Sequence, residues 1–181
     1  ARGHDGRAHL LYVGSIFNRR HIPTLIAAFD DLAARRSDAV LHIVGDNRSH
    51  PRLDIGALIA GSPHSARILW HQYVGDDELA RLFGQARGFV FLSEYEGLGL
   101  TPLEALACGI PSVLLDTTVA RESCGDAGLY VRLGDRRAIG QALEAVLYDE
   151  GTRARLLAAA PAVLRRYDWR RAATETLRVL E

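Results

Sequence analysis

Six short apolar runs, each followed by a longer stretch with helical spacing, most constrain how this chain of 181 residues can fold. Each run places apolar side chains at consecutive positions, which is typical of strands buried on both faces. The runs cover residues 9–15, 39–45, 66–74, 88–93, 110–116 and 127–133. Because strands that alternate with helices pair in parallel through right-handed crossovers, we predict an α/β fold with a doubly wound, six-stranded parallel sheet of the Rossmann-like type.

The stretches between the runs predict the helices that cover this sheet. Residues 22–36 repeat apolar side chains at helical spacing, and other helices are expected over 76–83, 101–108 and 135–148, with a short one within 48–63. Residues 150–181 predict two more helices, separated near Asp168, whose side chain suits an N-cap. No repeat, linker or low-complexity segment interrupts the pattern. We therefore predict one domain, with a core over about 9–149 and C-terminal helices over about 150–181.

The composition excludes several classes of protein. Apolar residues make up 48% of the chain and charged residues 24%, which excludes a disordered or fibrous protein. The 22 basic and 22 acidic residues balance, so we predict no nucleic-acid partner. No apolar run approaches the roughly 20 residues that cross a bilayer, and we expect a cytoplasmic protein. Cys108 and Cys124 lack a metal-binding spacing and are expected to be buried thiols.

The carboxyl ends of the strands are where a doubly wound sheet binds its ligands. That rule selects the loops over residues 14–21, 74–77 and 93–101. In the third loop, Gly97 and Gly99 flank a single leucine before a helix, so consecutive N–H groups at the helix N-terminus can bind phosphate. Glu104 lies about one turn inside that helix, where a carboxylate suits the hydroxyls of a ribose. Taken alone, the same residues also fit an ordinary turn and solvated carboxylates.

The surroundings of this loop carry a resemblance to a known family. Glu96 and Glu104 lie within EGLGLTPLEALACGIPSV, which resembles the donor-site signature of retaining glycosyltransferases of the GT-B fold, glycosyltransferase family 4. Further segments resemble the same family in the same order: VGSIFNRRHIPTLIAAF, HQYVGDDELARLFGQARGFVFLSEYEG, ARESCGDAGLYV and YDWRRAATETL. The resemblance implies that residues 1–181 are the C-terminal, nucleotide-sugar-binding domain of such an enzyme, with extra C-terminal helices. The chain contains no methionine, so we expect it to be a piece of a longer protein whose N-terminal acceptor domain lies outside it.

The resemblance also implies a role for each matching position. Glu104 would hold the ribose hydroxyls, and Glu96 would orient the donor sugar rather than attack it. Arg19 and Arg20 fall on the basic pair that neutralises the diphosphate, so the catalytic residues it implies are Glu96, Arg19 and Arg20. The backbone of Val74 aligns with the part that meets the base. The donor-binding residues implied are Gly14, Ser15, Val74, Gly97, Leu98, Gly99, Leu100, Thr101 and Glu104.

The chain also departs from the family pattern at several positions. Ser15 stands where many members have another phosphate-binding arginine, although others have a small residue there. Leu98 replaces the usual phenylalanine between the glycines, and Thr101 stands where proline is frequent. Apart from Ser15, these changes remove no charged group, so they bear on the identity of the sugar more than on the family.

The function that the resemblance implies is donor binding in a glycosyltransferase that transfers a hexose to an acceptor hydroxyl with retention. The departing diphosphate would be stabilised by the arginines and by the N–H groups of the loop. Two alternatives stay open: a non-catalytic module that binds a nucleotide or a partner, and a GT-B enzyme of another class such as a nucleotide-sugar epimerase. The nucleotide sugar is a substrate, so no cofactor is predicted.

Histidines and C-terminal arginines are the residues of this sequence that bear on metal binding and on membrane contact. The seven histidines are scattered, and there is no Asp-x-Asp motif, so we predict no metal ion. Five arginines near the C-terminus could form a basic face that meets anionic lipid at the inner face of the membrane, or a solvated helix face. They are Arg165, Arg166, Arg170, Arg171 and Arg178.

Overall fold

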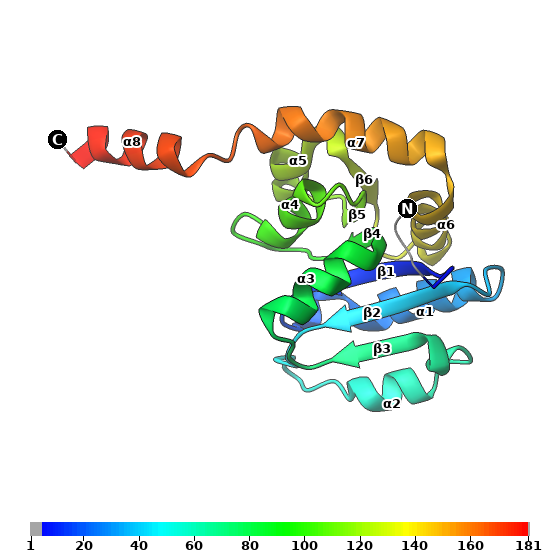
Figure 1. The fold of residues 1–181 in the computed structure, drawn as a ribbon. Helices are drawn as coiled ribbons and strands as arrows, with labels where there is room; N and C mark the ends of the chain where they lie inside the picture. Colours follow the sequence, from blue (N-terminus) through cyan, green and yellow to red (C-terminus); the bar gives the residue numbers. More distant parts are fainter. Residues whose placement is uncertain (1–4, 181) are drawn as a thin grey trace.

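The six apolar runs form a single parallel sheet in the computed structural model, which describes residues 5–180 (Figure 1). The strands are β1 Ala8–Val13, β2 Ala39–Val44, β3 Ile68–His71, β4 Ala86–Phe91, β5 Ser112–Leu115 and β6 Gly128–Val131. Their order is β3-β2-β1-β4-β5-β6, and every neighbouring pair is parallel. The predicted doubly wound α/β fold is confirmed. Successive strands are added on one side of β1 up to β3 and on its other side from β4 onward, so the strand order reverses between β1 and β4, and ligands are expected there.

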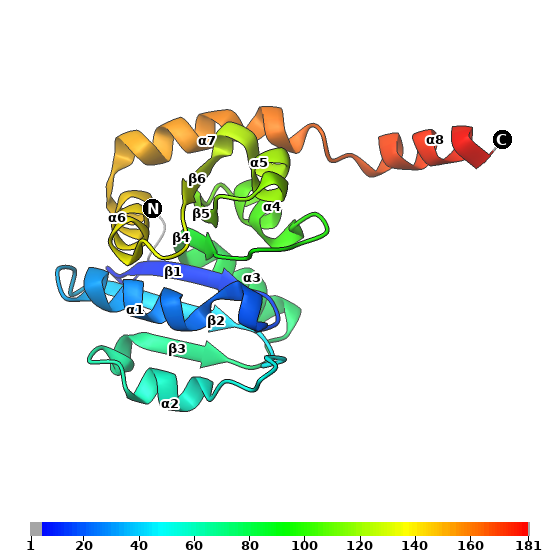
Figure 2. The same ribbon diagram turned by 180° about the vertical axis from the view of Figure 1, so that it is seen from behind.

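Helices cover both faces of the sheet, as buried strands require. On one face, α1 (Ile22–Ala33) packs beside α6 (Arg136–Tyr148), as the view from behind shows (Figure 2). On the other face lie α3 (Asp76–Gln85) and α4 (Leu100–Ala107). The shorter helices are α2 (Ile55–Ala60) and α5 (Thr118–Cys124), with 3-10 turns η1 (Asn18–Arg20), η2 (Ser65–Arg67) and η3 (Gly125–Ala127).

Strand β3 is shorter than the predicted run of residues 66–74. The 3-10 turn η2 occupies the residues just before it, and the chain leaves the sheet after His71. As an edge strand, β3 is also less buried than β1 and β2, which lie in the interior of the sheet. The apolar run therefore predicted a strand at the right place in the chain. The strand is shorter than the run, and as an edge strand it pairs on one side only.

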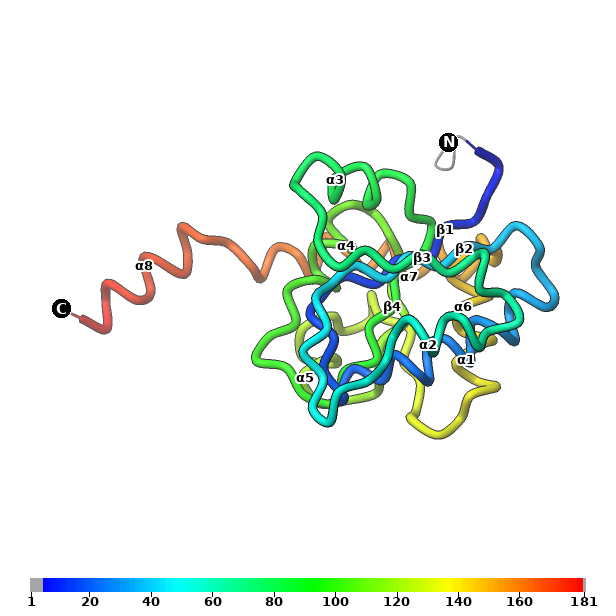
Figure 3. The backbone as a smooth tube through the Cα atoms, turned by 90° about the horizontal axis from the view of Figure 1, so that it is seen from below, coloured from blue at the N-terminus to red at the C-terminus, as the bar shows by residue number. Residues whose placement is uncertain are grey.

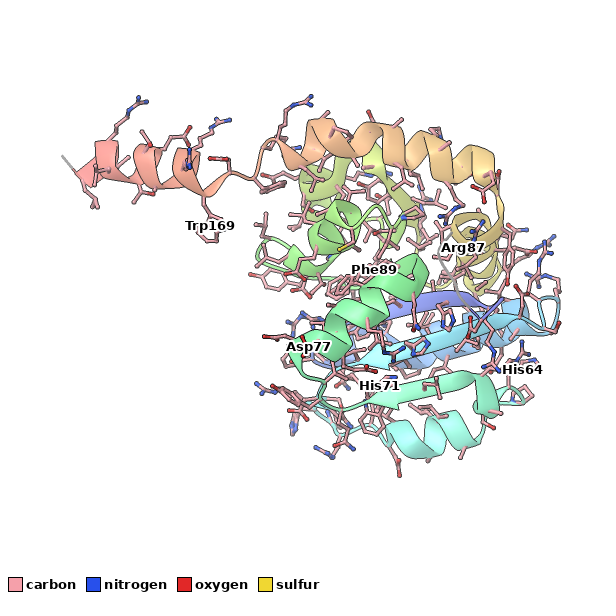
Figure 4. All side chains as sticks on the ribbon, viewed as in Figure 1. His64, His71, Asp77, Arg87, Phe89 and Trp169 are labelled. Carbon is pink, nitrogen blue, oxygen red and sulfur yellow. The ribbon has the colours of Figure 1, made fainter. Side chains whose placement is uncertain are left out.

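The two C-terminal helices behave differently. Helix α7 (Glu150–Leu164) packs against α4, α5 and α6 and buries Leu156 completely. Helix α8 (Trp169–Leu180) extends away from the rest of the chain and buries no residue (Figures 1 and 3). Trp169, at its start, is 90% exposed (Figure 4). Asp168 accepts the N–H of Arg171 at 2.8 Å, so the predicted N-cap is confirmed.

One sequence expectation about the thiols is wrong. Cys124 is buried, but Cys108 is exposed, because it follows the last turn of α4 at the surface of the groove between α3 and α4. Burial of small apolar residues is a common tendency rather than a rule. Among residues 5–180, no helix has the length and apolar character needed to cross a membrane.

Candidate functional site

Two loops meet where the carboxyl ends of β1 and β4 lie side by side. The first follows β1 and contains η1, and the second follows β4 and leads into α4. The backbone N–H of Glu94 donates to the carbonyl of Arg19 at 3.0 Å, and Arg19 Nε donates to the carbonyl of Tyr95 at 3.0 Å. The switch point of the sheet is thus closed by direct bonds between the two predicted ligand loops.

Glycine 14 makes room for an arginine inside this junction. The φ angle of Gly14 is +148°, and a Cβ atom at this position would lie 2.6 Å from Nη1 of Arg20. Directly after β2, a Cβ atom at Gly45 would lie 2.0 Å from the carbonyl oxygen of Gly14. Because only glycine avoids both clashes, the backbone after β1 can pass close to β2 and leave space for the guanidinium.

Arg20 is held from several sides within that space. Its Nε and Nη2 atoms both lie 2.8 Å from Oε1 of Glu96, and Nη1 donates to the carbonyl of Ser15 at 2.8 Å. The guanidinium also lies over the ring of Phe91, 4.8 Å from its centroid, and near the ring of Phe17. With 12% of its side chain exposed, Arg20 is a fixed positive charge rather than a mobile one.

Glu96 presents one oxygen to the protein and leaves the other available. Oε1 accepts from Arg20 and also from Ser93 Oγ at 2.8 Å. Oε2 has no hydrogen-bond partner among residues 5–180. The carboxylate is therefore positioned by Arg20 and Ser93, while one oxygen can accept a hydrogen bond from a ligand.

Arg19, in contrast to Arg20, leaves the end of its side chain unbonded within the described residues. Its Cζ atom lies 4.3 Å from the ring centroid of Phe17, and its Nε atom is bonded to the loop after β4. Within the described part of the chain, its two Nη atoms have no partner. A planar guanidinium with two free NH₂ groups is well suited to phosphate oxygens.

Helix α4 begins directly after the glycine loop. Gly99 has a φ angle of +79° and is the N-cap residue, and no side chain caps the helix. The N–H groups of Leu100 and Thr101 therefore remain available at the positive end of the helix dipole, beside the loop formed by Gly97 and Leu98. This is the arrangement that the sequence predicts for phosphate binding.

Glu104 lies on the other side of α4. Its side chain is exposed and lines an open groove between α3 and α4, together with Asp76, Leu79 and Phe83. Val74 is partly buried against the core in the loop that leads into α3. The structure thus brings Arg19, Arg20 and Glu96 together and places Glu104 in a separate groove, with the first turn of α4 between them.

Sequence reasoning missed four residues that shape this site. Ser93 positions Glu96, and the rings of Phe17 and Phe91 support the arginines. His21 adopts a left-handed φ angle of 50° at the N-cap of α1, with Nε2 3.2 Å from Glu94 Oε1 but outside hydrogen-bond geometry. Their only sequence signal is position, at strand ends and next to the arginine pair.

A row of histidines crosses the sheet at some distance from these residues. His42 Nε2 lies 2.9 Å from His9 Nδ1, and His42 Nδ1 lies 3.3 Å from His71 Nε2. Asp5 bonds to the far nitrogen of His9 at 3.1 Å. Burial lowers the pKa of His42 to about 4, with the neighbouring histidines acting in the same direction. Across residues 5–180, no three or more His, Cys, Asp or Glu side chains are grouped so that they could hold a metal ion.

The sequence of the chain is similar to those of known glycosyltransferases. The family model "Glycosyl transferases group 1" matches residues 2–163. The chain is 30% identical to O-antigen chain mannosyltransferase B of Escherichia coli over 171 residues, which cover 94% of the chain and 45% of that protein. It is 31% identical to D-inositol 3-phosphate glycosyltransferase of an Arthrobacter strain over 176 residues, covering 95% and 42%.

Solved structures agree on the fold. Sucrose-phosphate synthase from Thermosynechococcus elongatus matches with a TM-score of 0.81 at 24% identity, covering 96% of this chain and 45% of that one. The crystal structure of WaaG, a glycosyltransferase involved in lipopolysaccharide biosynthesis, matches with a TM-score of 0.70 at 21% identity, covering 91% and 44%. The chain spans less than half the length of each of these proteins.

Proposed function

Because the chain belongs to the group 1 glycosyl transferases, we propose that it binds a nucleoside-diphosphate sugar as the donor half of a retaining glycosyltransferase. The observation that carries this proposal is the pairing of Arg20 with Glu96 beside an uncapped helix N-terminus. It combines a fixed positive charge, a positioned carboxylate and free N–H groups at the switch point of the sheet.

The order of these groups along the sheet edge supports the assignment. The first turn of α4 lies between Glu96 on one side and the groove of Glu104 on the other, and Arg19 is bonded to the loop that leads into this helix. A nucleotide sugar presents its sugar, diphosphate, ribose and base in that order. The sugar would lie at Glu96, the diphosphate at the helix N-terminus, the ribose at Glu104 and the base near Val74.

The chemistry expected of this arrangement is stabilisation of a leaving group. As the sugar–phosphate bond breaks, negative charge grows on the diphosphate, and Arg19, Arg20 and the N–H groups of Leu100 and Thr101 would stabilise it. Oε2 of Glu96 would accept a hydrogen bond from a sugar hydroxyl and hold the hexose in place. The acceptor hydroxyl would then bond to the carbon that the diphosphate leaves, with its proton passing to the departing phosphate.

A second domain would supply the acceptor. The chain spans less than half of its relatives, and α8 leaves an apolar side without a partner in the described structure. We propose that this helix and the carboxyl ends of the strands face an N-terminal acceptor domain of the parent protein. Contact of the five arginines near the C-terminus with anionic lipid stays a prediction from the sequence.

Calorimetry on this chain with UDP, GDP, ADP and dTDP, each with and without EDTA, tests the donor role. One diphosphate is expected to bind, and chelation is expected to leave its affinity unchanged, because arginines and N–H groups take the place of a metal. Loss of binding in EDTA would contradict the metal-free site, and failure of all four to bind would contradict the donor role.

An assay with labelled donor on the complete parent protein separates the enzyme from a non-catalytic module. Sugar transfer is expected there and not with the 181-residue chain alone, because the acceptor must be positioned for reaction. Binding without transfer by the complete protein would assign a non-catalytic module instead.

A further inference from the structure

The two ligand loops at the switch point carry a histidine beside two arginines and two glutamates. Arg19, Arg20 and His21 follow β1, and Glu94 and Glu96 follow β4. The charges of the two arginines and the two glutamates cancel. The net charge of this group of side chains is therefore zero when the imidazole of His21 is neutral and positive when the imidazole is protonated.

The backbone holds His21 at this place in an uncommon conformation. Its φ angle of 50° is the only positive one at a residue other than glycine among residues 5–180. Its N–H donates to the carbonyl of Asn18 at 3.2 Å, and its carbonyl accepts the N–H of Leu25 in α1 at 3.0 Å. These bonds fix the turn between η1 and α1, and they leave only 20% of the His21 side chain exposed.

The imidazole faces a carboxylate without forming a hydrogen bond to it. Nε2 of His21 lies 3.2 Å from Oε1 of Glu94, and this nitrogen is buried and has no hydrogen-bond partner in the described part of the chain. A protonated ring places a positive charge beside the carboxylate, which a neutral ring does not. Glu94 is also tied to the arginine pair, because its N–H donates to the carbonyl of Arg19 at 3.0 Å. The charge of His21 therefore acts at the junction that holds Arg19.

The other charged groups near His21 pair with each other or are exposed. The first turn of α1 carries no acidic residue. On the loop after β2, Arg48 pairs with Asp46 at 3.0 Å, and His50 is exposed. Glu94 has no arginine partner among residues 5–180, so His21 is the group that can offset its negative charge.

We propose that His21 is a further residue of the donor site, where its positive charge offsets Glu94 and the donor binds together with a proton. The inference rests on the proposed donor function and adds a proton-linked residue to that site. A diphosphate meets no net positive charge in the two loops while His21 is neutral, and it meets one when His21 is protonated. A ligand that binds the protonated form more tightly also draws the proton onto it. Because histidine changes its charge between pH 5 and 8, donor affinity is expected to depend on pH near neutrality.

Calorimetry with intact nucleotide sugars at pH 6 and pH 8 tests the proposal. Both phosphates of a nucleotide sugar are esterified, so its charge is the same at the two pH values, whereas a terminal phosphate would itself take up a proton. The probes are UDP-glucose, GDP-mannose, ADP-glucose and dTDP-glucose. The probe that binds is expected to bind roughly fivefold more tightly at pH 6 than at pH 8. Its binding enthalpy at pH 7 is expected to differ between Mops and Tris buffers, because the buffer supplies the proton.

Two variants assign the pH dependence to His21 and Glu94. His21→Asn introduces a residue that also adopts the left-handed conformation but gains no charge, and at both pH values it is expected to bind the donor as the parent does at pH 8. Glu94→Gln removes the carboxylate that the imidazole offsets, and it is expected to bind the donor about twofold more tightly than the parent at pH 8. His50→Gln, which removes an exposed histidine of the neighbouring loop, is the control and should keep the fivefold difference. Circular dichroism shows whether each variant is folded.

The outcomes separate this inference from the proposed function. If none of the four probes binds at either pH, the donor role itself fails. If a probe binds equally at both pH values, or more tightly at pH 8, the donor role stands and the role of His21 is overturned. Retention of the pH difference in His21→Asn would also overturn it, because the proton would then bind elsewhere. Glu94→Gln tests the same role without changing the backbone at residue 21, and donor binding no tighter than that of the parent at pH 8 would count against it.

Discussion

Glu96 and Glu104, the two glutamates of the candidate site, lie in opposite surroundings. Glu96 is bonded through one oxygen to Arg20 and Ser93, and 18% of its side chain is exposed. Glu104 is exposed on the far side of α4, in a groove that it shares with Asp76. The first carboxylate is held in place before any ligand arrives, and the second is free to adjust.

This difference has an energetic consequence. A pre-positioned group loses little entropy when the ligand binds, but its partners depend on it for their own pairing. An exposed group contributes almost nothing to folding, so changing it affects the ligand alone. Stability and binding should therefore separate between the two glutamates.

The largest effect is expected for Glu96→Ala. Removing this carboxylate leaves Arg20 mostly buried without its counter-charge, and we expect the free energy of unfolding to fall by about 3 kcal/mol. Urea denaturation followed by circular dichroism measures this. Glu94→Ala, an exposed change in the same loop, is the control and should stay within about 0.5 kcal/mol of the parent. Equal stability of the two variants would show that the Arg20–Glu96 pair is not a structural unit.

The row of His9, His42 and His71 is another set of polar groups that bond to one another within the protein. Burial lowers the pKa of His42 from its ordinary value of about 6.5 to about 4 in the folded chain, so acid favours the unfolded state. Its contribution to stability is complete above about pH 6.5 and decreases as the pH falls toward 4. Between pH 7 and pH 5 we expect a loss of about 2 kcal/mol from this group.

Denaturation curves at pH 7 and pH 5 measure that loss. His42→Asn is expected to reduce the difference between the two pH values, whereas His50→Gln, which removes an exposed histidine, should keep it. An unchanged pH dependence in His42→Asn would mean that other groups cause the loss.

For the exposed glutamate, the expected effect is on binding. Glu104→Gln keeps a hydrogen-bond acceptor but loses the charge, so we expect roughly tenfold weaker binding of nucleoside diphosphate and unchanged stability. Calorimetry measures the affinity, with Glu122→Gln, another exposed carboxylate, as the control. Binding as tight as that of the parent would remove Glu104 from the ribose site.

Glu96→Gln tests the role of the other glutamate in the complete parent enzyme. We expect it to lower turnover more than nucleotide affinity, because the group faces the sugar rather than the nucleotide. A variant with normal turnover would leave Glu96 as a partner of Arg20 only.

The smallest effect is expected at the C-terminal helices, where α7 is packed and α8 is not. Trp169→Ala should change the free energy of unfolding of this chain by less than about 0.5 kcal/mol, because the side chain is 90% exposed. Thermal denaturation tests this. A marked drop in the melting temperature would show that α8 packs against the domain in solution.

The local pattern of the sequence determined much of this protein. Runs of consecutive apolar residues marked all six strands, and helical spacing with Asp168 as a cap marked the last helices. The glycine loop before α4 was identified because glycine and an uncapped helix start are visible within a few residues. Such features depend on neighbours along the chain, which is why the order of the residues is enough to reveal them.

Tertiary structure alone decided how the site is assembled. Arg20 and Glu96 are 76 positions apart, and they meet because β4 pairs with β1 rather than with β3. The way α4 packs on the sheet then places Glu96 and Glu104 on different sides of this helix and leaves Cys108 exposed at its end. A chain's periodicity fixes which face of each element is apolar, but contacts between distant loops follow from which strands lie side by side, and that depends on the packing of the whole core.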